Sequence, residues 1–462
     1  MTKEILPSER LSAAKAEAEA QRFAREAFCG RRFYSGCQWD DYRGAPIPRP
    51  VFNVVARIID LKAGQLGSCE YSPRFVGDES GELNAYIARF AERNRLSRVV
   101  NSLIYNSAIT GSGVCYLWRE GLEVRAKSVE PTSLLCADPL IADTQSQPYL
   151  LLTSRKRMEL PPSIRGAKTA DADENGFVPV ELRFFRGGDG LVRFEESCGD
   201  AVLRRGETGR RLYPFAVMRW NGDIGGFYGA GAAAALEANQ KYLNMAYALA
   251  MRHMTETAFS KVIYDRALIP EWNDSVGEAI GVMSGGDVSR AAAVIGVGQL
   301  SDGYLDLISR AAADTKELHG ATEAALGEGA ASNTSAILAL QRASDIPLRG
   351  VKQRLADTVS DIATIAAEMS EETKTALSRG TVRAETAVSE TDGWTASAEA
   401  AELKRLYEAG DISAADYVKR LPRGVISDRE GLIADILSHK KEKPKERIER
   451  KERKEDEREQ RN

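Results

Sequence analysis

Residues 301–369 constrain the fold more than any other part of the chain, because they contain two helical patterns joined by a run of small residues. In the first pattern, apolar or small residues recur at alternating three- and four-residue steps and would share one face of a helix. These residues are Ile308, Ala311, Thr315, Leu318 and Thr322. Because this face is narrow, we expect the helix to pack closely against neighbours.

The second pattern has a stronger apolar face at the same spacing. Its residues are Val351, Leu355, Val359, Ile362, Ala366 and Met369. Pro347 lies in the early turns of this helix, which predicts a kink or a late start. Between the two patterns, glycine frees the backbone, and Ser332 or Asn333 can cap the following helix. The spacing alone indicates an ordinary helical hairpin.

The bulk composition is that of a globular protein without a global attraction to nucleic acid. At 462 residues, the chain is long enough for two or three domains. Its formal net charge is −4, so any contact with DNA would have to be local or transient. No apolar run of about 18 residues occurs, so we predict no membrane span. The N-terminus also lacks the apolar core of a signal peptide, and we expect reduced thiols in a cytoplasm.

Residues that carry common enzyme chemistry are sparse. The six cysteines form no CxxC pair and there are three histidines, so neither a zinc site nor a histidine-dependent triad is expected. No phosphate-binding GxxxxGKS/T loop, GxSxG elbow or HExxH pattern occurs. Asp138 and Asp143 could pair as carboxylates, but an Asp-Pro step is a common turn former. We therefore predict no enzymatic activity, no metal ion and no cofactor.

Periodicity along the chain changes from helical to alternating and back. Helices are predicted at residues 9–28 (ending near Gly30), 54–61, 83–109, 232–258, 398–408, 414–421 and 428–438. Strands of one antiparallel sheet domain, over residues 112–220, are predicted at 114–118, 124–129, 149–154, 178–185 and 191–195. Further strand-like stretches are 261–264, 292–297 and 381–384. The final residues from Lys440 are almost all charged and predict a solvated helix or a disordered tail.

Several short motifs occur in the order found in the portal proteins of tailed bacteriophages, which the chain resembles over most of its length. The motifs are Gln38-Trp39 with Arg49-Pro50 and Asn53, Glu130-Pro131 with Asp138-Pro139, Tyr213-Pro-Phe215 with Phe227-Tyr-Gly229, the helix segment from Gln240 to Asn244, and the segment from Leu406 to Ala414. The segment from Asn333 to Leu340 is also similar to the signature that follows the channel loop in this family. Each motif is weak alone, and their shared order carries the resemblance.

The resemblance implies an α+β portal fold, with a mixed α/β wing, a two-helix stem, an inserted clip, a long wing helix and a helical crown or tail. The implied parts are 1–111 (helical wing), 112–230 (β-rich wing), 231–258 (first stem helix), 259–300 (clip), 301–325 (second stem helix), 326–333 (tunnel loop), 334–370 (long wing helix), 371–438 (C-terminal wing or crown) and 439–462 (charged tail).

The function implied by the resemblance is that of a ring, usually of twelve subunits, at one vertex of a capsid. Double-stranded DNA would pass through without sequence specificity, packaged by terminase and later ejected. The implied partners are further copies of the chain, the large terminase subunit, the major capsid or scaffold protein, and a head-completion or tail adaptor protein, with no membrane. The implied location is the virion, after assembly in the host cytoplasm.

Two sets of residues would line the channel under this interpretation. The tunnel loop would be Gly327, Glu328, Gly329, Ala330, Ala331, Ser332 and Asn333. The stem charges would be Asp306, Asp314, Glu317 and Glu323. Because the loop is small and lacks basic residues, a flexible gasket is expected rather than a gripping lever. Duplex DNA must slide, so the stem carboxylates could repel its phosphates and reduce sticking.

The main alternative is a DNA-independent scaffold or adaptor that forms a ring from similar helices, and an enzyme with an unfamiliar site is the third. A DNA conduit requires a hole wider than about 20 Å, as the dimensions of the duplex dictate. A scaffold needs no such hole, and an enzyme would have a deep polar pocket within one subunit.

Overall fold

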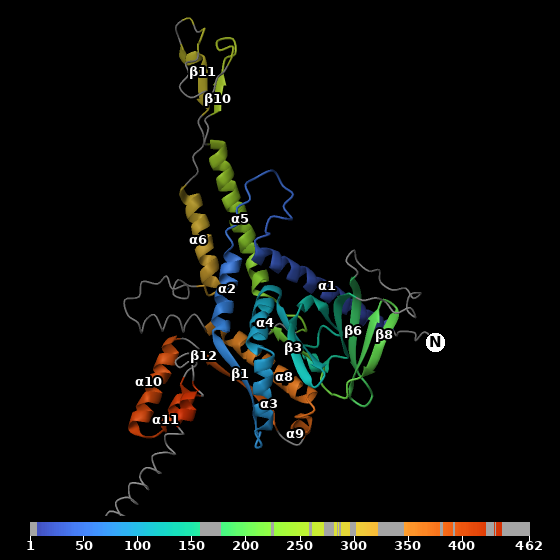
Figure 1. The fold of residues 1–462 in the computed structure, drawn as a ribbon. Coiled ribbons are helices and arrows are strands. Elements are labelled where there is room, and N and C mark those ends of the chain that lie inside the picture. The colour runs from blue at the N-terminus through green and yellow to red at the C-terminus, as the bar shows by residue number, and fades with distance from the viewer. Residues whose placement is uncertain are drawn as a thin grey trace, which may run out of the picture.

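The computed structural model shows a mixed α+β protein with several antiparallel sheets, which confirms the expected α+β class (Figure 1). It describes residues 7–157, 177–222, 226–257, 261–271, 281–283, 285, 288–295, 302–321, 346–378, 382–390, 393–421, 429 and 431–436. We call the described residues up to 230, together with 346–390, the body. The described residues between 232 and 318 form a narrow projection from it (Figure 1).

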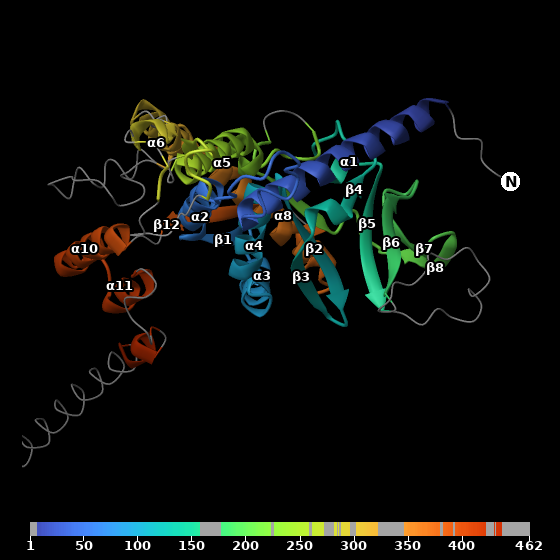
Figure 2. The ribbon, with the colours of Figure 1, turned by 90° about the horizontal axis from the view of Figure 1, so that it is seen from above.

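The main helices are α1 (Pro7–Ser35), α2 (Val54–Gly67), α3 (Glu82–Arg93), α4 (Leu96–Thr110), α5 (Ala232–Thr257), α6 (Asp302–Leu318), α8 (Arg349–Met369), α9 (Lys374–Ser378), α10 (Gly393–Ala409) and α11 (Ala414–Arg420). No described helix combines the length and the apolar character that crossing a bilayer requires. Seen from above, α5 and α6 lie on the same side of the molecule as α10 and α11, and strands β5 to β8 with the start of α1 lie on the opposite side (Figure 2).

The strands are β1 (Cys69–Val76), β2 (Ser112–Glu120), β3 (Glu123–Val129), β4 (Leu134–Cys136), β5 (Tyr149–Arg157), β6 (Phe177–Arg186), β7 (Val192–Cys198), β8 (Ala201–Glu207), β9 (Phe215–Arg219), β10 (Lys261–Tyr264), β11 (Ala292–Ile295) and β12 (Arg383–Glu390). Within the body, β1 pairs with β12, the order β3-β2-β9 forms a second sheet, and β4 to β8 form a third in chain order. The β1–β12 pair joins segments more than three hundred residues apart.

The predicted end of the first helix near Gly30 is wrong, because α1 continues to Ser35. Gly30 lies where α1 crosses α4. A Cβ atom at this position would lie only 2.4 Å from the carbonyl oxygen of Ile109. Glycine here permits two helices to approach each other and does not end the helix.

The single helix predicted over residues 83–109 is in fact two helices, α3 and α4. They are separated at Asn94 and Arg95, and Arg95 has a φ of 48°. The Asn94 side chain donates to the Val124 carbonyl at 3.1 Å and accepts from the Ala126 N–H at 3.0 Å. The break is therefore held by contacts with β3, which the helical period does not reveal.

The one sheet domain predicted over residues 112–220 is two antiparallel sheets. Periodicity correctly placed strands β2, β3, β5, β6 and β7, but missed β4, β8 and β9. It missed β4 because this strand has three residues, too few to show alternation. It missed β8 because most of the side chains of this strand are at least partly exposed and several are charged.

The sheet of β3, β2 and β9 is an internal layer, because β2 alternates between two cores. Cys115 and Leu117 point into the core that contains the helices. Val114 and Tyr116 point the other way, into the core shared with the five-stranded sheet. The body therefore has three layers, in the order helices, three-stranded sheet and five-stranded sheet.

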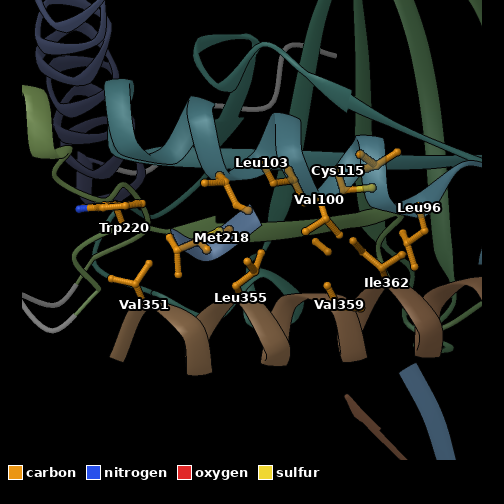
Figure 3. Close-up of a cluster of buried hydrophobic side chains, with 14 of the residues drawn as sticks. Leu96, Val100, Leu103, Cys115, Met218, Trp220, Val351, Leu355, Val359 and Ile362 are labelled. Carbon is orange, nitrogen blue, oxygen red and sulfur yellow. The ribbon is translucent and has the colours of Figure 1, made fainter. Parts of the chain in front are cut away.

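Helix α8 runs beneath α4 and supplies much of the larger core (Figure 3). It follows a short turn at Ile346–Leu348, which agrees with the kink or late start expected at Pro347. Its six predicted apolar residues are all buried. Figure 3 shows Val351, Leu355 and Val359 pointing from α8 toward α4 and β9. Residues 334–345, the first part of the predicted helix, lie outside the described residues.

The predicted helices at 398–408 and 414–421 are present as α10 and α11. Gly410, with a φ of 82°, ends α10, and its N–H donates to the Tyr407 carbonyl at 3.1 Å. Ser413 caps α11 by accepting from the Asp416 N–H at 3.2 Å. The rings of Tyr407 and Tyr417 stack with 5.2 Å between their centroids. Residues 429 and 431–436 are helical, and the predicted charged tail at 439–462 lies outside the described residues.

Candidate functional site

The projection consists of α5, α6 and the hairpin of β10 and β11 (Figure 1). Helix α5 leaves the body and α6 returns beside it, while β10 and β11 pair antiparallel beyond them. The 26 residues of α5 give it a length of about 40 Å. The helix predicted at 232–258 and the strand-like stretches at 261–264 and 292–297 are confirmed over 232–257, 261–264 and 292–295, and residues 258, 296 and 297 lie outside the described residues.

Small side chains hold α5 and α6 together. The buried residues of this contact are Leu243, Ala246, Ala250 and Ile308. The Tyr304 hydroxyl donates to the Ala246 carbonyl at 3.1 Å, and the Asn239 amide donates to the Thr315 hydroxyl at 3.2 Å. Alanines allow the two backbones to lie close together, so the pair is thin and has little core of its own.

Helix α6 ends earlier than predicted. Its last residue is Leu318, and Gly320, with a φ of 76°, closes it by donating to the Glu317 carbonyl at 2.9 Å. Ile308 and Thr315 are buried as expected, but Leu318 is 80% exposed. The predicted place of Leu318 on the packed face is wrong, because this face stops one turn before the helix end. Thr322 lies outside the described residues.

A second apolar stripe runs along α5, on the face that solvent reaches. It consists of Ala235, Ala238, Tyr242, Met245 and Leu249, at steps of three and four residues. Tyr242 is 49% exposed and Leu249 47% exposed, and Met245 is half-buried. On α6, Leu305 and Leu307 are also about half exposed. A stripe with helical spacing is the pattern of a packed face, yet no described residue covers this one.

The predicted stem charges that the structure describes lie on the outer face of α6. Asp306, Asp314 and Glu317 are all exposed. At 3.6 residues per turn, Asp306 and Glu317 lie roughly opposite Ile308, which packs on α5. Arg310 lies among them, so this face carries three carboxylates and one guanidinium. The fourth predicted charge, Glu323, lies outside the described residues.

The predicted tunnel loop also lies outside the described residues. None of Gly327, Glu328, Gly329, Ala330, Ala331, Ser332 or Asn333 is among them. The described chain stops at Ala321, three residues after the end of α6, and resumes at Ile346. The loop therefore remains a prediction from the sequence.

Buried amides join the projection to the body. Gln240, on the packed face of α5, is 1% exposed. Its side-chain oxygen accepts from the Val54 N–H at 2.9 Å, and its amide nitrogen donates to the Phe52 carbonyl and to the Asn244 side chain, both at 2.9 Å. Asn244 in turn donates to the Gln38 side chain at 2.6 Å. One side chain thus ties α5 to the start of α2.

The same network continues into the loop before α2. Gln38 donates to the Asn53 side chain at 3.1 Å. Asn53 caps α2 by accepting from the Ala56 N–H at 3.0 Å, and it donates to the Tyr34 carbonyl at 2.8 Å. Gln38, Asn53, Gln240 and Asn244 were singled out as separate motifs in the sequence, and the structure brings them together. Sequence reasoning missed this convergence, although two amides four residues apart on an apolar helix face are a detectable signal.

The other motif residues have structural contacts. The Trp39 indole donates to a main-chain carbonyl of its own loop at 2.8 Å. The buried Tyr213 hydroxyl donates to the Gln147 carbonyl at 3.0 Å. At Gly229, a Cβ atom would lie 2.2 Å from the carbonyl oxygen of Gly111, so the two chain segments can cross only at glycine. In the structure, these motif residues hold loops and permit a close crossing of chain segments.

The chemistry available to side chains in the described part of the chain is limited. Asp138 and Asp143 accept N–H bonds from Leu140 and Gln145, which confirms that they form turns. No group of three or more His, Cys, Asp or Glu side chains among the described residues could hold a metal ion. Burial raises the pKa of the Cys115 thiol to about 12, so this cysteine is a poor nucleophile.

The sequence matches no protein-family model, and a search of curated proteins also finds no match. The resemblance to portal proteins therefore depends on the motifs in the sequence. The geometry of the projection is an independent observation.

Proposed function

We propose that this chain is the subunit of a portal-type ring that conducts double-stranded DNA through a capsid vertex. The observation that carries the proposal is the projection, which exposes a regular apolar stripe on α5 and an acidic face on α6. In this assignment α5 and α6 are the two stem helices, the β10–β11 hairpin belongs to the clip, and the body is the wing. α10 and α11 belong to the crown.

The apolar stripe favours assembly with further copies of the chain. Exposed Tyr242 and Leu249 would lose their contact with water against a neighbouring projection, and burial stabilises by about 25 cal/mol per Å² of apolar surface. The alanines of the stripe would let neighbouring helices approach closely. A ring needs a heterologous interface, in which one surface of each subunit packs against a different surface of the next. Leu305 and Leu307 on α6 are both exposed but point to opposite sides of the helix, so either one, and not the two together, is a candidate for such a second surface.

The acidic face of α6 favours a conduit for DNA over a site that grips it. Lysine and arginine that neutralise phosphates release counterions and bind tightly, which would oppose sliding. Asp306, Asp314 and Glu317 outnumber Arg310 on the outer face of α6, which points away from α5. If this face lines the channel, DNA meets net negative charge there and moves without being held. No sequence specificity is then required.

The assignment implies partners that act at the two ends of the channel. The β10–β11 hairpin, at the far end of the projection, would face the large terminase subunit during packaging and a head-completion or tail adaptor protein afterwards. The body would contact the capsid or scaffold protein. On this proposal the chain itself has no enzymatic activity and works as a conduit and docking platform.

Electron microscopy of the purified full chain, classified for rotational symmetry, tests the assembly. We expect rings near twelve-fold with an axial hole wider than about 20 Å. The double variant Tyr242→Glu/Leu249→Glu should dissociate the rings, because it places charge in the stripe. The matched control Thr255→Glu alters an exposed residue on another face of α5 and should leave them intact. A ring with a hole too narrow for duplex DNA would support the scaffold alternative, and a closed dimer with an internal pocket would contradict both.

A second experiment tests the acidic face separately. The triple variant Asp306→Lys/Asp314→Lys/Glu317→Lys should still form rings but should retain DNA, and its packaging should slow most at low salt because phosphate contacts weaken as salt rises. The control is Arg310→Lys, which keeps the charge of this face. Unchanged packaging by the triple variant would contradict the proposed repulsion while leaving the ring assembly untouched.

A further inference from the structure

A cavity of about 330 Å³ lies between the outer end of β2 and the five-stranded sheet. Its walls come from β2, β6, β7 and β8 and from the loop that joins β8 to β9. We call it the inter-sheet cavity. It lies in the body and does not involve α5 or α6, so it is independent of the proposed ring assembly.

The walls of the inter-sheet cavity are mostly aromatic. Tyr116 and Trp118 stand side by side on β2, with 5.9 Å between their ring centroids. Phe184 faces Tyr116 from β6 with 6.4 Å between centroids, and Phe194 lies on β7. Aromatic walls favour flat apolar groups, which they contact by stacking and by edge-to-face packing. The volume is at the lower end of the range for small-molecule sites.

The charged residues of the lining are all cations. Arg119, Arg204 and Arg210 line the cavity, and none of its lining residues is a carboxylate. Two of the three guanidinium groups are already engaged. Arg119 donates to Glu371 at 2.7 Å, and Arg204 is paired with Glu196 and lies over the ring of Phe194.

Arg210 differs from the other two arginines. It is half-buried, and within the described part of the chain its guanidinium makes neither a hydrogen bond nor an ion pair. Burial, followed by the charge of Arg119, lowers the pKa of Arg210. Its main chain is fixed, since its N–H donates to the Thr208 hydroxyl at 3.3 Å. The nearby carboxylates of Glu371 and Glu368 partly offset the effect of burial on the pKa of Arg210. A guanidinium offers five N–H donors in a rigid fork, and those of Arg210 are free to bond a ligand that enters the cavity.

We propose that the inter-sheet cavity binds a small molecule with one or two aromatic rings and one anionic group. The rings would lie between Tyr116, Trp118 and Phe194, and the anion would accept hydrogen bonds from Arg210. A carboxylate or sulfonate matches the fork of the guanidinium and supplies the missing acceptors. Because the other two arginines of the lining are already paired with carboxylates, Arg210 decides the preference: a cationic ligand would be repelled by it, and a neutral one would make no charge-assisted bond to it.

The test is a fluorescence titration of the full chain with 8-anilinonaphthalene-1-sulfonate, an aromatic anion. N-phenyl-1-naphthylamine, which has the same rings without the sulfonate, is the matched neutral probe. We expect saturable binding of the anion and binding of the neutral probe that is about tenfold weaker. Arg210→Gln should weaken binding of the anion about tenfold and leave the neutral probe unchanged.

Two further variants separate the cavity from other apolar surfaces that take up dye, including the stripe on α5. Arg205→Gln removes an exposed cation on β8 that does not line the cavity, and it should bind both probes as the unaltered chain does. Leu182→Trp adds bulk to the cavity wall and should abolish the saturable binding of both probes. Near-ultraviolet circular dichroism shows that each variant is folded.

The proposal would be overturned by any of three results. One is equal affinity of Arg210→Gln and Arg205→Gln for the anionic probe. Another is a neutral probe that binds the unaltered chain as tightly as the anion. The third is unchanged dye binding by folded Leu182→Trp, which would place the dye outside the cavity.

Discussion

The body and the projection differ in where their largest apolar side chains lie, although the body also exposes some, among them Phe28, Leu122 and Leu140. The twelve largest fully buried side chains all lie in the body, among them Ile58, Leu103 and Leu117. In the projection, the core between α5 and α6 contains alanines with Leu243 and Ile308. At the same time the projection exposes many large apolar side chains, namely Tyr242, Leu249, Met254, Ile263, Met283, Leu305, Leu307 and Leu318.

This difference distinguishes the region whose apolar surface is covered within one chain from the region whose apolar surface is left for contact with another molecule. Each layer of the body covers its neighbour, so the hydrophobic effect stabilises it within one subunit. Helix α5 has apolar residues at the regular spacing of a packed helix on two faces. Among the described residues, only one of these faces is covered. Exposed apolar area of this extent marks an interaction surface. On the proposed function, the body accounts for the fold of one subunit, and the projection for its assembly.

The largest expected effect is loss of a body side chain. Leu355→Ala removes a fully buried residue of α8 from the core in Figure 3 and should lower the free energy of unfolding by about 2–5 kcal/mol. The matched change Leu307→Ala on the projection, where the side chain is 51% exposed, should change it by less than about 0.5 kcal/mol. Urea denaturation of the dissociated subunit measures both. Equal effects would remove the distinction between the two regions.

The junction between the regions should give an intermediate effect. Gln240→Leu removes the buried side-chain bonds to the Val54 N–H, the Phe52 carbonyl and the Asn244 side chain, which should cost about 1–3 kcal/mol. Hydrogen exchange should speed up at the start of α2 and leave α4 unchanged. Asn239→Leu, which removes the one bond to Thr315, is the milder control. If the amides of α2 exchanged as slowly in Gln240→Leu as in the unaltered chain, the amide network would not join the projection to the body.

The contacts of Glu196 with Lys156 and Arg204, inside the body, should give a smaller effect that depends on pH. Burial alone would raise the pKa of Glu196, but hydrogen bonds and charges from Lys156 and Arg204 outweigh it and lower the pKa below its ordinary value of 4.5. The stabilisation is therefore present above pH 4.5 and is lost as the pH falls through the lowered pKa. Glu196→Gln should cost about 1 kcal/mol at pH 7 and flatten this part of the pH profile of unfolding. If the free energy of unfolding of Glu196→Gln fell with decreasing pH as steeply as that of the unaltered chain, Glu196 would not be the group responsible for this loss of stability.

The smallest effect concerns reactivity and leaves stability unchanged. Cys37 is exposed, whereas Cys69, Cys115, Cys136 and Cys198 are buried. Burial is the main cause that raises the pKa of Cys136 to about 12 and that of Cys29 to about 11. At pH 8 a thiol reagent should therefore modify Cys37 rapidly, and the other thiols should react only in denaturant. Peptide mapping identifies the modified residue, and rapid labelling of Cys115 would show that the body opens.

The sequence by itself determined the elements whose signal is local and periodic. The apolar face of α8 and the extent of α5 could be predicted, because a helix shows its buried face at regular steps. The acidic residues of α6 were also visible in the sequence, although the predicted helix was too long. Leu318 has the spacing of the packed face of α6 and was wrongly predicted to lie on it. The spacing of apolar residues does not show where the contact with a neighbouring helix ends.

Only the tertiary structure decided which distant segments meet. It placed Gln38 and Asn53 against Gln240 and Asn244, and it divided one predicted helix at Asn94 through contacts with β3. It also showed that Gly30 permits two helices to cross. The physical reason is that a pattern of apolar residues indicates which face of an element is buried. Which segment packs on that face depends on residues that can be hundreds of positions away in the sequence. On α5 the second apolar stripe is such a face, and within one subunit it remains uncovered.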